Sequence, residues 1–240
     1  MTSPEFAGGP DPNPPTPAAT VVCLRPGPAG PEVLLLRRRS KGAFGGMWVF
    51  PGGKVDPEDW GPGDDEVAAG RNAAVREAAE EAAIVVDPAT VVTLSYWLPP
   101  PEAARRFSTW FYLAPVLGED PIVLSQDEVG DHRWEPPAAM LAAHAAGEVQ
   151  LAPPTWMTLH WLAGYRTIDD ALAAAAGSEP ERFLTRAVIS DDGQLVSTVW
   201  EGDVAYDDLD LDPGRPGPRR RLEVRRGAWV ALLDPVPEGS

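Results

Sequence analysis

Two neighbouring stretches decide the fold: Trp-Val-Phe-Pro-Gly-Gly at residues 48–53, and Arg-Glu-Ala-Ala-Glu-Glu-Ala-Ala-Ile at residues 76–84. The first is a short apolar run that enters a turn, where two glycines after a proline let the backbone bend sharply. The second belongs to an Ala-rich, proline-free run from Val67 to Ala83, which predicts a helix that Asp87-Pro88 stops. Strand-like runs flank this pair on both sides, so the sequence predicts a mixed α/β domain.

Three carboxylates share one face of the predicted helix. At about 100° per residue, Glu77 and Glu81 stack one turn apart and Glu80 lies beside them. Without a cation, these like charges would repel one another. Hard oxygen ligands on a rigid helix suit magnesium or manganese, so the cluster predicts a metal site. Taken alone, the cluster would be explained more simply as a solvent-exposed acidic face balanced by Arg76, four residues before Glu80.

Together, the two stretches resemble the Nudix box. In that family a glycine precedes an acidic loop and then the pattern Arg-Glu-apolar-any-Glu-Glu-any-Gly-apolar, which Gly53 and residues 76–84 follow. Two differences stand out. Arg76 follows Gly53 by 23 positions, which is longer than the family's spacing, and Ala83 replaces the family's glycine. The longer loop leaves three candidates for the loop acid, namely Glu58, Asp59 and Glu66.

The resemblance implies a fold and a reaction. The implied fold is an α/β/α sandwich with a mixed sheet, to which this chain adds a small β-rich C-terminal appendage. The implied reaction is metal-dependent hydrolysis of a diphosphate linkage in a nucleoside diphosphate joined to another moiety. Glu77, Glu80 and Glu81 would hold Mg²⁺, for which Mn²⁺ could substitute. Glu80, Glu81 and Arg76 would be catalytic, with Arg76 orienting Glu80 or the loop carboxylate.

A second resemblance concerns the substrate. Residues 127–134 and 151–155 resemble the peroxisomal coenzyme-A diphosphatase-like branch of the family. That branch has an arginine at the position of Gly42, so its coenzyme-A signature is incomplete here. Coenzyme A, ADP-ribose, NADH and nucleotide sugars all stay open as the small-molecule partner.

The reaction also needs a general base and contacts to the substrate. Glu128, on a later loop before a strand, is the candidate base, although an exposed acid without function fits that position equally well. Gly52 and Gly53 would fix the helix against the strand and offer backbone contacts to the substrate. Trp97 and Phe107 flank a loop of three prolines and are candidates for stacking on a base, with burial in the core as the alternative.

Charge and composition limit the other partners. The formal net charge is −16, which disfavours nucleic-acid polymers and anionic membrane surfaces. A single cysteine, Cys23, excludes an intramolecular disulfide framework and favours a reducing, cytoplasmic location. The sequence shows neither a secretory leader nor an apolar run long enough to span a membrane.

Three regions are expected along the chain. Residues 1–18 read as a disordered leader, residues 19–165 as the Nudix domain, and residues 166–240 as a helix followed by a β-rich extension that could form a homodimer contact. In the extension, residues 183–189 and 195–200 predict a hairpin around Asp191-Asp192-Gly193. Two other interpretations compete with an enzyme: a non-catalytic Nudix-fold module that binds a nucleotide, and an unrelated α/β protein with an incidental acidic helix.

Overall fold

The computed structural model describes residues 13–39, 45–116, 118, 121–125 and 129–234. Its larger sheet is mixed and has eight strands: β1 Thr16–Gly27, β2 Gly30–Arg38, β3 Trp48–Val49, β4 Gly52–Lys54, β5 Val92–Leu98, β6 Phe107–Pro115, β7 Val129–Glu135 and β8 Glu181–Leu184. The smaller sheet is antiparallel and holds β9 Arg186–Ile189, β10 Leu195–Val199, β11 Arg220–Arg225 and β12 Ala228–Leu233. The helices are α1 Glu66–Ala82, α2 Pro137–Ala145, α3 Pro153–Leu162 and α4 Ile168–Ala176, with 3₁₀ turns at Pro57–Asp59 and Pro88–Thr90.

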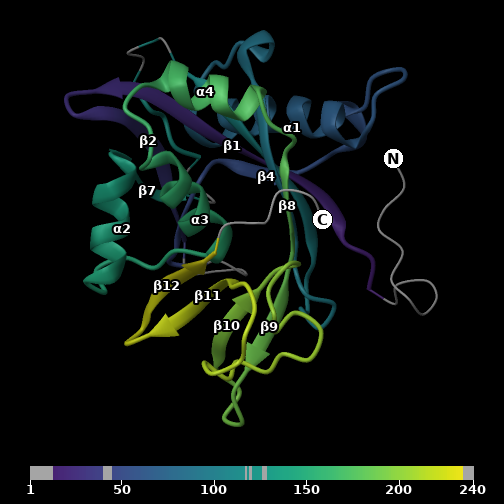
Figure 1. The fold of residues 1–240 in the computed structure, drawn as a ribbon. Coiled ribbons are helices and arrows are strands. Elements are labelled where there is room, and N and C mark those ends of the chain that lie inside the picture. The colour runs from purple at the N-terminus through teal and green to yellow at the C-terminus, as the bar shows by residue number, and fades with distance from the viewer. Residues whose placement is uncertain (1–12, 40–44, 117, 119–120, 126–128, 235–240) are drawn as a thin grey trace.

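The central strand β1 sorts the core into two layers. Because side chains alternate along a strand, Val21 and Cys23 face one side of the sheet while Val22 and Leu24 face the other. The first layer packs against α1, and the second packs against α2, α3 and α4. Figure 1 shows α1 on the far side of the sheet from those three helices. The predicted α/β/α sandwich with a mixed sheet is therefore confirmed.

Small residues let α1 lie close to the sheet. Its inward side carries alanines that are fully buried, and the side chain of Asp65 caps its first turn by accepting from the amide of Ala68. A Cβ atom on Gly70 would come within 2.5 Å of the Tyr112 hydroxyl, which donates to the Val67 carbonyl at 2.8 Å. The helix ends at Ala83, whose φ of 55° is left-handed. The sequence places an alanine where this backbone favours glycine.

The C-terminal extension divides where a single strand was expected. Residues 183–189 were predicted to form one side of a hairpin, but they form two strands in different sheets. Strand β8 pairs in parallel with β5 at the edge of the large sheet, and only β9 pairs with β10 as a hairpin. The chain passes from one sheet to the other at Thr185, so one apolar run serves two sheets.

Aromatic rings join the two sheets. Trp97 on β5 stacks on Phe183 of β8 at a centroid distance of 3.9 Å, and Trp200 packs edge-on against both rings. Trp200 is fully buried, and its indole Nε1 donates to the Thr185 hydroxyl at 3.1 Å. The smaller sheet is therefore anchored through the main core (Figure 1).

A second anchor joins β12 to the α2 and α3 region. Trp229 donates its backbone N–H to His144 Nε2 at 3.0 Å and its indole Nε1 to the Leu151 carbonyl at 2.9 Å. His144 itself is buried, and its Nδ1 lies 3.1 Å from the Val149 carbonyl, so Nδ1 carries the proton. Burial lowers the pKa of His144 despite the bond to Val149, which keeps the ring neutral.

The start of the domain differs slightly from expectation. Strand β1 begins at Thr16, inside the segment predicted to be a disordered leader, and residues 1–12 lie outside the described structure. Cys23 is buried, and burial raises the pKa of its thiol to about 12, as suits a core residue. Within the described residues, no helix has the length and hydropathy needed to cross a bilayer.

Candidate active site

The Gly52–Gly53 turn presses against the carboxylates of α1. Strand β4 pairs with β1, which sets Gly52 opposite Thr20 and Gly53 opposite Ala19. The amide of Gly52 donates to Glu81 Oε2 at 3.0 Å. A Cβ atom on Gly53 would lie 2.1 Å from Glu77 Oε1, so only glycine leaves room for that carboxylate. The turn therefore positions two of the three predicted metal ligands.

Arg38, at the end of β2, holds the other oxygen of Glu81. Its Nη2 lies 3.0 Å from Glu81 Oε1 and donates to the Gly52 carbonyl at 2.9 Å. The Glu81 side chain is only 4% exposed, so this contact neutralises a carboxylate that is almost out of water. Sequence reasoning missed Arg38. The available signal was strand alternation, because Leu34 and Leu36 face α1 and the next residue in that series is Arg38.

Arg76 is the hub of a carboxylate network. Its guanidinium makes a two-pronged contact with Asp59, from Nε to Oδ1 at 3.1 Å and from Nη2 to Oδ2 at 2.9 Å. Its Nη1 reaches Glu77 Oε1 at 2.9 Å and Glu80 Oε2 at 3.2 Å. Of the three loop acids left open by the sequence, Asp59 is therefore the one that binds Arg76. The arrangement orients Glu77 and Glu80 from one side.

The electrostatics of this network favour the charged forms. Hydrogen bonds to Asp59, ahead of its other interactions, raise the pKa of Arg76. Burial pushes the pKa of Asp59 upward, but the bonds from Arg76 and from the Asp56 amide outweigh it, so the net pKa lies below the usual value. Asp59 is thus a buried anion that fixes the guanidinium in place.

The donor set suits a hard divalent cation. Glu77, Glu80 and Glu81 offer carboxylate oxygens from one helix, and their side chains are 14%, 59% and 4% exposed. Among the described residues no three acidic, histidine or cysteine side chains already stand together as a metal cluster. Arg76 Nη1 lies between Glu77 and Glu80, which shows that this space accepts positive charge. Because Glu80 is exposed, it can rotate toward the other two with little loss of packing.

The predicted general base, Glu128, lies outside the described residues. The nearest described residues on either side are close to the site. The amide of Ser125 donates to the Glu81 carbonyl at 3.1 Å, and Val129 pairs with Arg38 across β2 and β7. The amide of Val129 also donates to the Ser125 carbonyl at 3.1 Å.

The two aromatic residues proposed for base stacking lie elsewhere. Trp97 is 4% exposed and is covered by Phe183, so it is a core residue and presents no ring face to a ligand. Phe107 is half-buried at the start of β6, opposite Thr16, whereas Gly52 pairs with Thr20. The structure therefore does not bring Phe107 to the carboxylates. Burial is the physical reason for Trp97, since an aromatic ring next to a proline-rich loop has the same sequence signature in a core and at a surface.

Comparison with protein families decides the kinship of this chain. The model of the NUDIX domain matches residues 14–155, which is more than half of the sequence. The chain belongs to the Nudix family. Members of this family generally hydrolyse pyrophosphate linkages with the help of divalent cations. The matched range contains the Gly-Gly turn, the loop acid Asp59 and all of α1.

Individual relatives are distant. The chain is 28% identical over 213 residues to "Putative nudix hydrolase 7" of Caenorhabditis elegans, a match that covers 74% of this chain and 70% of the relative. Among solved structures, a NUDIX hydrolase from Alicyclobacillus acidocaldarius superposes with a TM-score of 0.61 at 24% identity, covering 70% of this chain and 99% of that protein. Nearly all of that solved protein therefore superposes on part of this chain, which supports the Nudix fold.

Proposed function

We propose that this Nudix protein is a metal-dependent hydrolase of a diphosphate linkage in a nucleoside diphosphate joined to another moiety, such as coenzyme A, ADP-ribose, NADH or a nucleotide sugar. The observation that carries the proposal is the position of Glu81. It is held between the Gly52 amide and Arg38, on the helix face that also presents Glu77 and Glu80. Such a preorganised carboxylate set beside a glycine turn suits an anionic diphosphate substrate.

Glu77, Glu80 and Glu81 are the residues that would hold Mg²⁺, or Mn²⁺ in its place. When bound, the cation would supply charge neutralisation and a lowered pKa for water. The protein's own contribution is to aim the carboxylates: Gly53 leaves room for Glu77, and Arg76, fixed by Asp59, holds Glu77 and Glu80. Arg76 is therefore a positioning residue in this proposal, and Gly52 and Gly53 line the substrate side.

Arg38 completes the anion-binding side of the site. It lines a cavity of about 330 Å³ with Arg37, Arg39, Gly46, Gly130 and one acid, Asp131, so three arginines face one carboxylate. The cavity adjoins Glu81 through the contact with Arg38. Guanidinium groups bind phosphate oxygens with two parallel N–H donors, so this cavity is where the diphosphate would bind.

Glu128 is proposed as the general base that takes a proton from the attacking water. The proposal is supported by its described chain neighbour Val129, which pairs with Arg38, the residue that contacts Glu81. The substitution Glu128→Gln would lower turnover by about 10²–10⁴-fold. It would also remove the acid limb of the pH–rate profile, whereas a variant that only disturbed the fold would retain that limb.

Phosphate release from a panel of diphosphate compounds tests the proposal. With Mg²⁺ or Mn²⁺ and a coupled phosphatase, the wild type is compared with Glu80→Gln and Glu81→Gln. The matched control is Glu179→Gln, an exposed glutamate before β8. Metal-dependent turnover that collapses in the first two variants and persists in the control is the expected result. Absence of turnover on every compound, with nucleotide binding that survives both substitutions, would replace the hydrolase by a regulatory nucleotide-binding module.

A further inference from the structure

Two cavities meet at the end of β2. The first, described above, shares Arg37 and Gly46 with a second cavity of about 370 Å³. The second cavity is lined by Trp48, Arg133 and residues 147–150 of the loop between α2 and α3. Because the two share lining residues, one ligand can extend from the first into the second.

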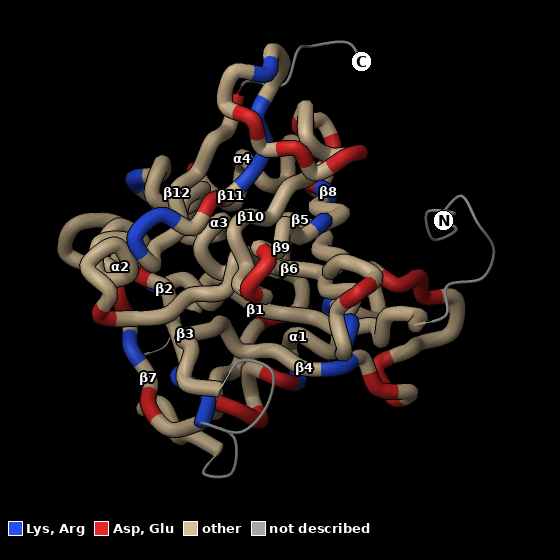
Figure 2. Tube along the Cα trace, turned by 90° about the horizontal axis from the view of Figure 1, so that it is seen from below, with Lys and Arg blue, Asp and Glu red and all other residues tan. Residues whose placement is uncertain are grey.

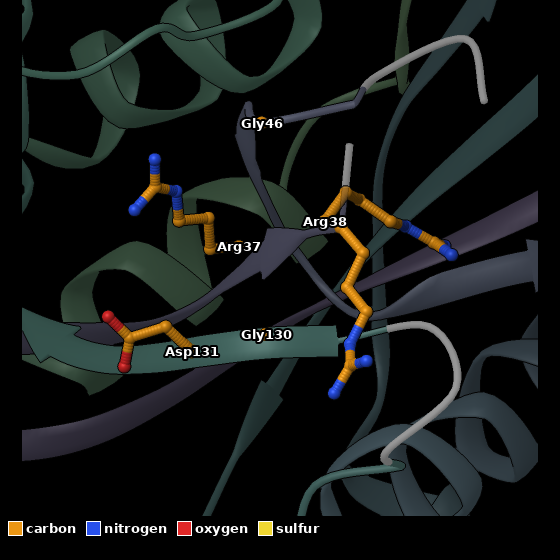
Figure 3. A pocket seen from close by; sticks show the side chains of 6 residues that line it. Arg37, Arg38, Gly46, Gly130 and Asp131 are labelled. Atoms are coloured by element: carbon orange, nitrogen blue, oxygen red, sulfur yellow. The ribbon is translucent and has the colours of Figure 1, made fainter. Parts of the chain in front are cut away.

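The second cavity lies on the other face of the sheet from the carboxylates. Arg38 faces α1 and contacts Glu81, so its neighbour Arg37 projects to the opposite side, as Figure 3 shows for the labelled side chains. On the adjacent strand, Arg133 pairs with Leu35 and Asp131 pairs with Arg37. Arg37 and Arg133 therefore project from the same face of neighbouring strands, two positions apart.

The side chains of these two arginines have no carboxylate or hydrogen-bond partner within the described part of the chain. The guanidinium of Arg133 lies instead over the ring of Trp48, 4.6 Å from its centroid. Glu148 is the only acid among the described residues that line the second cavity, and Asp131, which lines the first, pairs with Arg37 across the strands. Over the two cavities, four arginines (Arg37, Arg38, Arg39 and Arg133) face these two acids. In a chain with a net charge of −16, such a local excess of positive charge marks a place where an anion binds. Figure 2 shows basic segments beside β7, close to acidic ones.

The cavity recognises charge and does not stack on a base. Trp48 is the only aromatic residue in the described lining, and it is 3% exposed beneath Arg133. A ligand therefore meets guanidinium groups rather than a ring face. Guanidinium forks match the oxygens of a phosphate monoester, which can accept several N–H bonds at once.

The wall of this cavity is fixed from three directions. The backbone N–H of Trp48 donates to the Gln150 carbonyl at 3.0 Å, and His144 Nδ1 contacts the Val149 carbonyl. Trp229, from the C-terminal sheet, donates to the carbonyl of the next residue, Leu151. The C-terminal extension thus helps to hold the loop that forms the pocket.

From this arrangement we infer that the second cavity binds a phosphate monoester that the substrate carries in addition to the scissile diphosphate, such as one on its ribose. The inference rests on the proposed function and narrows its substrate class. Arg37 and Arg133 are the specificity-determining residues, while Arg38 and the α1 carboxylates act on the diphosphate. The enzyme therefore discriminates between substrates that differ by a single ribose phosphate.

Matched substrate pairs test this directly. ADP-ribose is compared with its 2′-phosphorylated form, and 3′-dephospho-coenzyme A with coenzyme A, so that the two arms distinguish a 2′- from a 3′-phosphate. In at least one pair, the wild type should favour the phosphorylated member by about 10- to 100-fold in kcat/KM, mainly through KM. Arg133→Gln should remove most of that preference and leave turnover of the unphosphorylated member within about threefold. Arg37→Gln should also remove the preference but lower turnover of both members, because Arg37 lines the diphosphate cavity as well. Equal kcat/KM within both pairs would overturn the inference.

The control is Arg182→Gln. Arg182 also stacks on an aromatic ring, lying 4.6 Å from the centroid of Tyr96, but it does not line either cavity. Its substitution should leave the preference for phosphorylated substrates intact. A preference that survives in the Arg37→Gln and Arg133→Gln double variant would locate the phosphate elsewhere and refute the assignment.

Binding of product-like probes separates this inference from the proposed reaction. Calorimetric titration with adenosine 2′,5′-bisphosphate, adenosine 3′,5′-bisphosphate and AMP needs no turnover. Tighter binding of a bisphosphate than of AMP, lost in the double variant, would support the subsite even if no diphosphate were hydrolysed. Equal binding of all three would refute the subsite, whether or not the hydrolase assay succeeds.

Discussion

Two arginine–carboxylate centres, one in each half of the molecule, show opposite designs. Arg76 on α1 is 26% exposed and contacts four acids, namely Asp56, Asp59, Glu77 and Glu80. Arg221 on β11 is 1% exposed and makes a two-pronged contact with the fully buried side chain of Asp203. Both use guanidinium forks, but the first has a surplus of negative charge and the second is nearly balanced.

The Arg76 network has carboxylate oxygens left to bind a ligand, whereas the buried Arg221–Asp203 pair has a structural role. Asp203 also accepts backbone bonds from Ala205 and Arg220, so both of its oxygens have donors from the protein and none is left for a ligand. Burial raises the pKa of Asp203, but the bonds from Arg221 and from those amides outweigh this and lower it overall. Around Arg76, in contrast, the carboxylates exceed what one guanidinium can satisfy, which leaves acceptor capacity for a cation.

Removing the buried Arg221–Asp203 pair should have the largest effect on stability. Arg221→Met leaves Asp203 buried without its cation, so we expect the free energy of unfolding to fall by about 3–5 kcal/mol. Urea denaturation at neutral pH measures this. The control Arg225→Met removes an exposed partner of Glu223 and should cost less than about 1 kcal/mol. An equal fall in the free energy of unfolding in both variants would show that the buried pair has no special structural role.

Disrupting the carboxylate network around Arg76 should affect activity more than stability. Asp59→Asn removes the charge that fixes Arg76. If Glu77 and Glu80 hold the cation as proposed, we expect kcat/KM to fall by about 10- to 100-fold, the usual loss when a group that orients a metal ligand is changed. Asp56→Asn is the matched control, since Asp56 is exposed and lies 3.6 Å from Arg76. It should change kcat/KM by less than about threefold. Equal losses in the two variants would contradict the role given to Asp59.

Stability at two pH values tests the contact between the two halves that involves a neutral side chain, the bond from the Trp229 N–H to His144. His144 has a pKa below its usual 6.5, so its contribution to stability is complete above that pH and declines as the pH falls below it. Protonation would place a hydrogen on Nε2, which accepts from Trp229, at a cost of about 1–3 kcal/mol. Denaturation midpoints at pH 7.5 and 5.5 should differ less in His144→Gln than in the wild type. His132→Gln should leave the difference between the two midpoints as large as in the wild type. An equal reduction of that difference in both variants would refute the attribution of the pH effect to His144.

The end of α1 offers the smallest effect. Ala83 has a left-handed backbone, so Ala83→Gly should raise the free energy of unfolding by about 0.5–1 kcal/mol. Ala79→Gly, at an exposed position inside the same helix, should lower it by about 1 kcal/mol. Thermal denaturation of both variants gives the comparison. Destabilisation by Ala83→Gly would mean that the left-handed backbone of Ala83 does not cost the folded protein stability.

Local patterns predicted the elements that depend on their own residues. The alanines and the absence of proline from Val67 to Ala83 predicted α1, and strand-like runs on both sides of it predicted the mixed α/β domain. The division of residues 183–189 between two sheets could not be foreseen this way. It depends on the parallel pairing of β8 with β5, a contact between segments far apart in the sequence.

The same limit applies to the site. Helical spacing was enough to group Glu77, Glu80 and Glu81, because they lie within one turn of each other. The choice of Asp59 over Glu58 and Glu66, and the contact between Arg38 and Glu81, depend on how the loop and β2 fold back onto α1. For Trp97 the sequence left stacking on a base and burial in the core both open for a related reason, since its covering ring, Phe183, lies 86 residues further along the chain.

The Trp97–Phe183 stack has a consequence for biosynthesis. Translation proceeds at about 5–20 residues per second, so roughly 4–17 s pass between the synthesis of Trp97 and that of Phe183. During that interval the Nudix half can begin to fold, but the outer edge of β5 has no strand to pair with and an indole ring lacks its cover. A nascent chain in this state exposes an unpaired strand edge and apolar surface, and slower translation of residues 98–183 would lengthen that exposure.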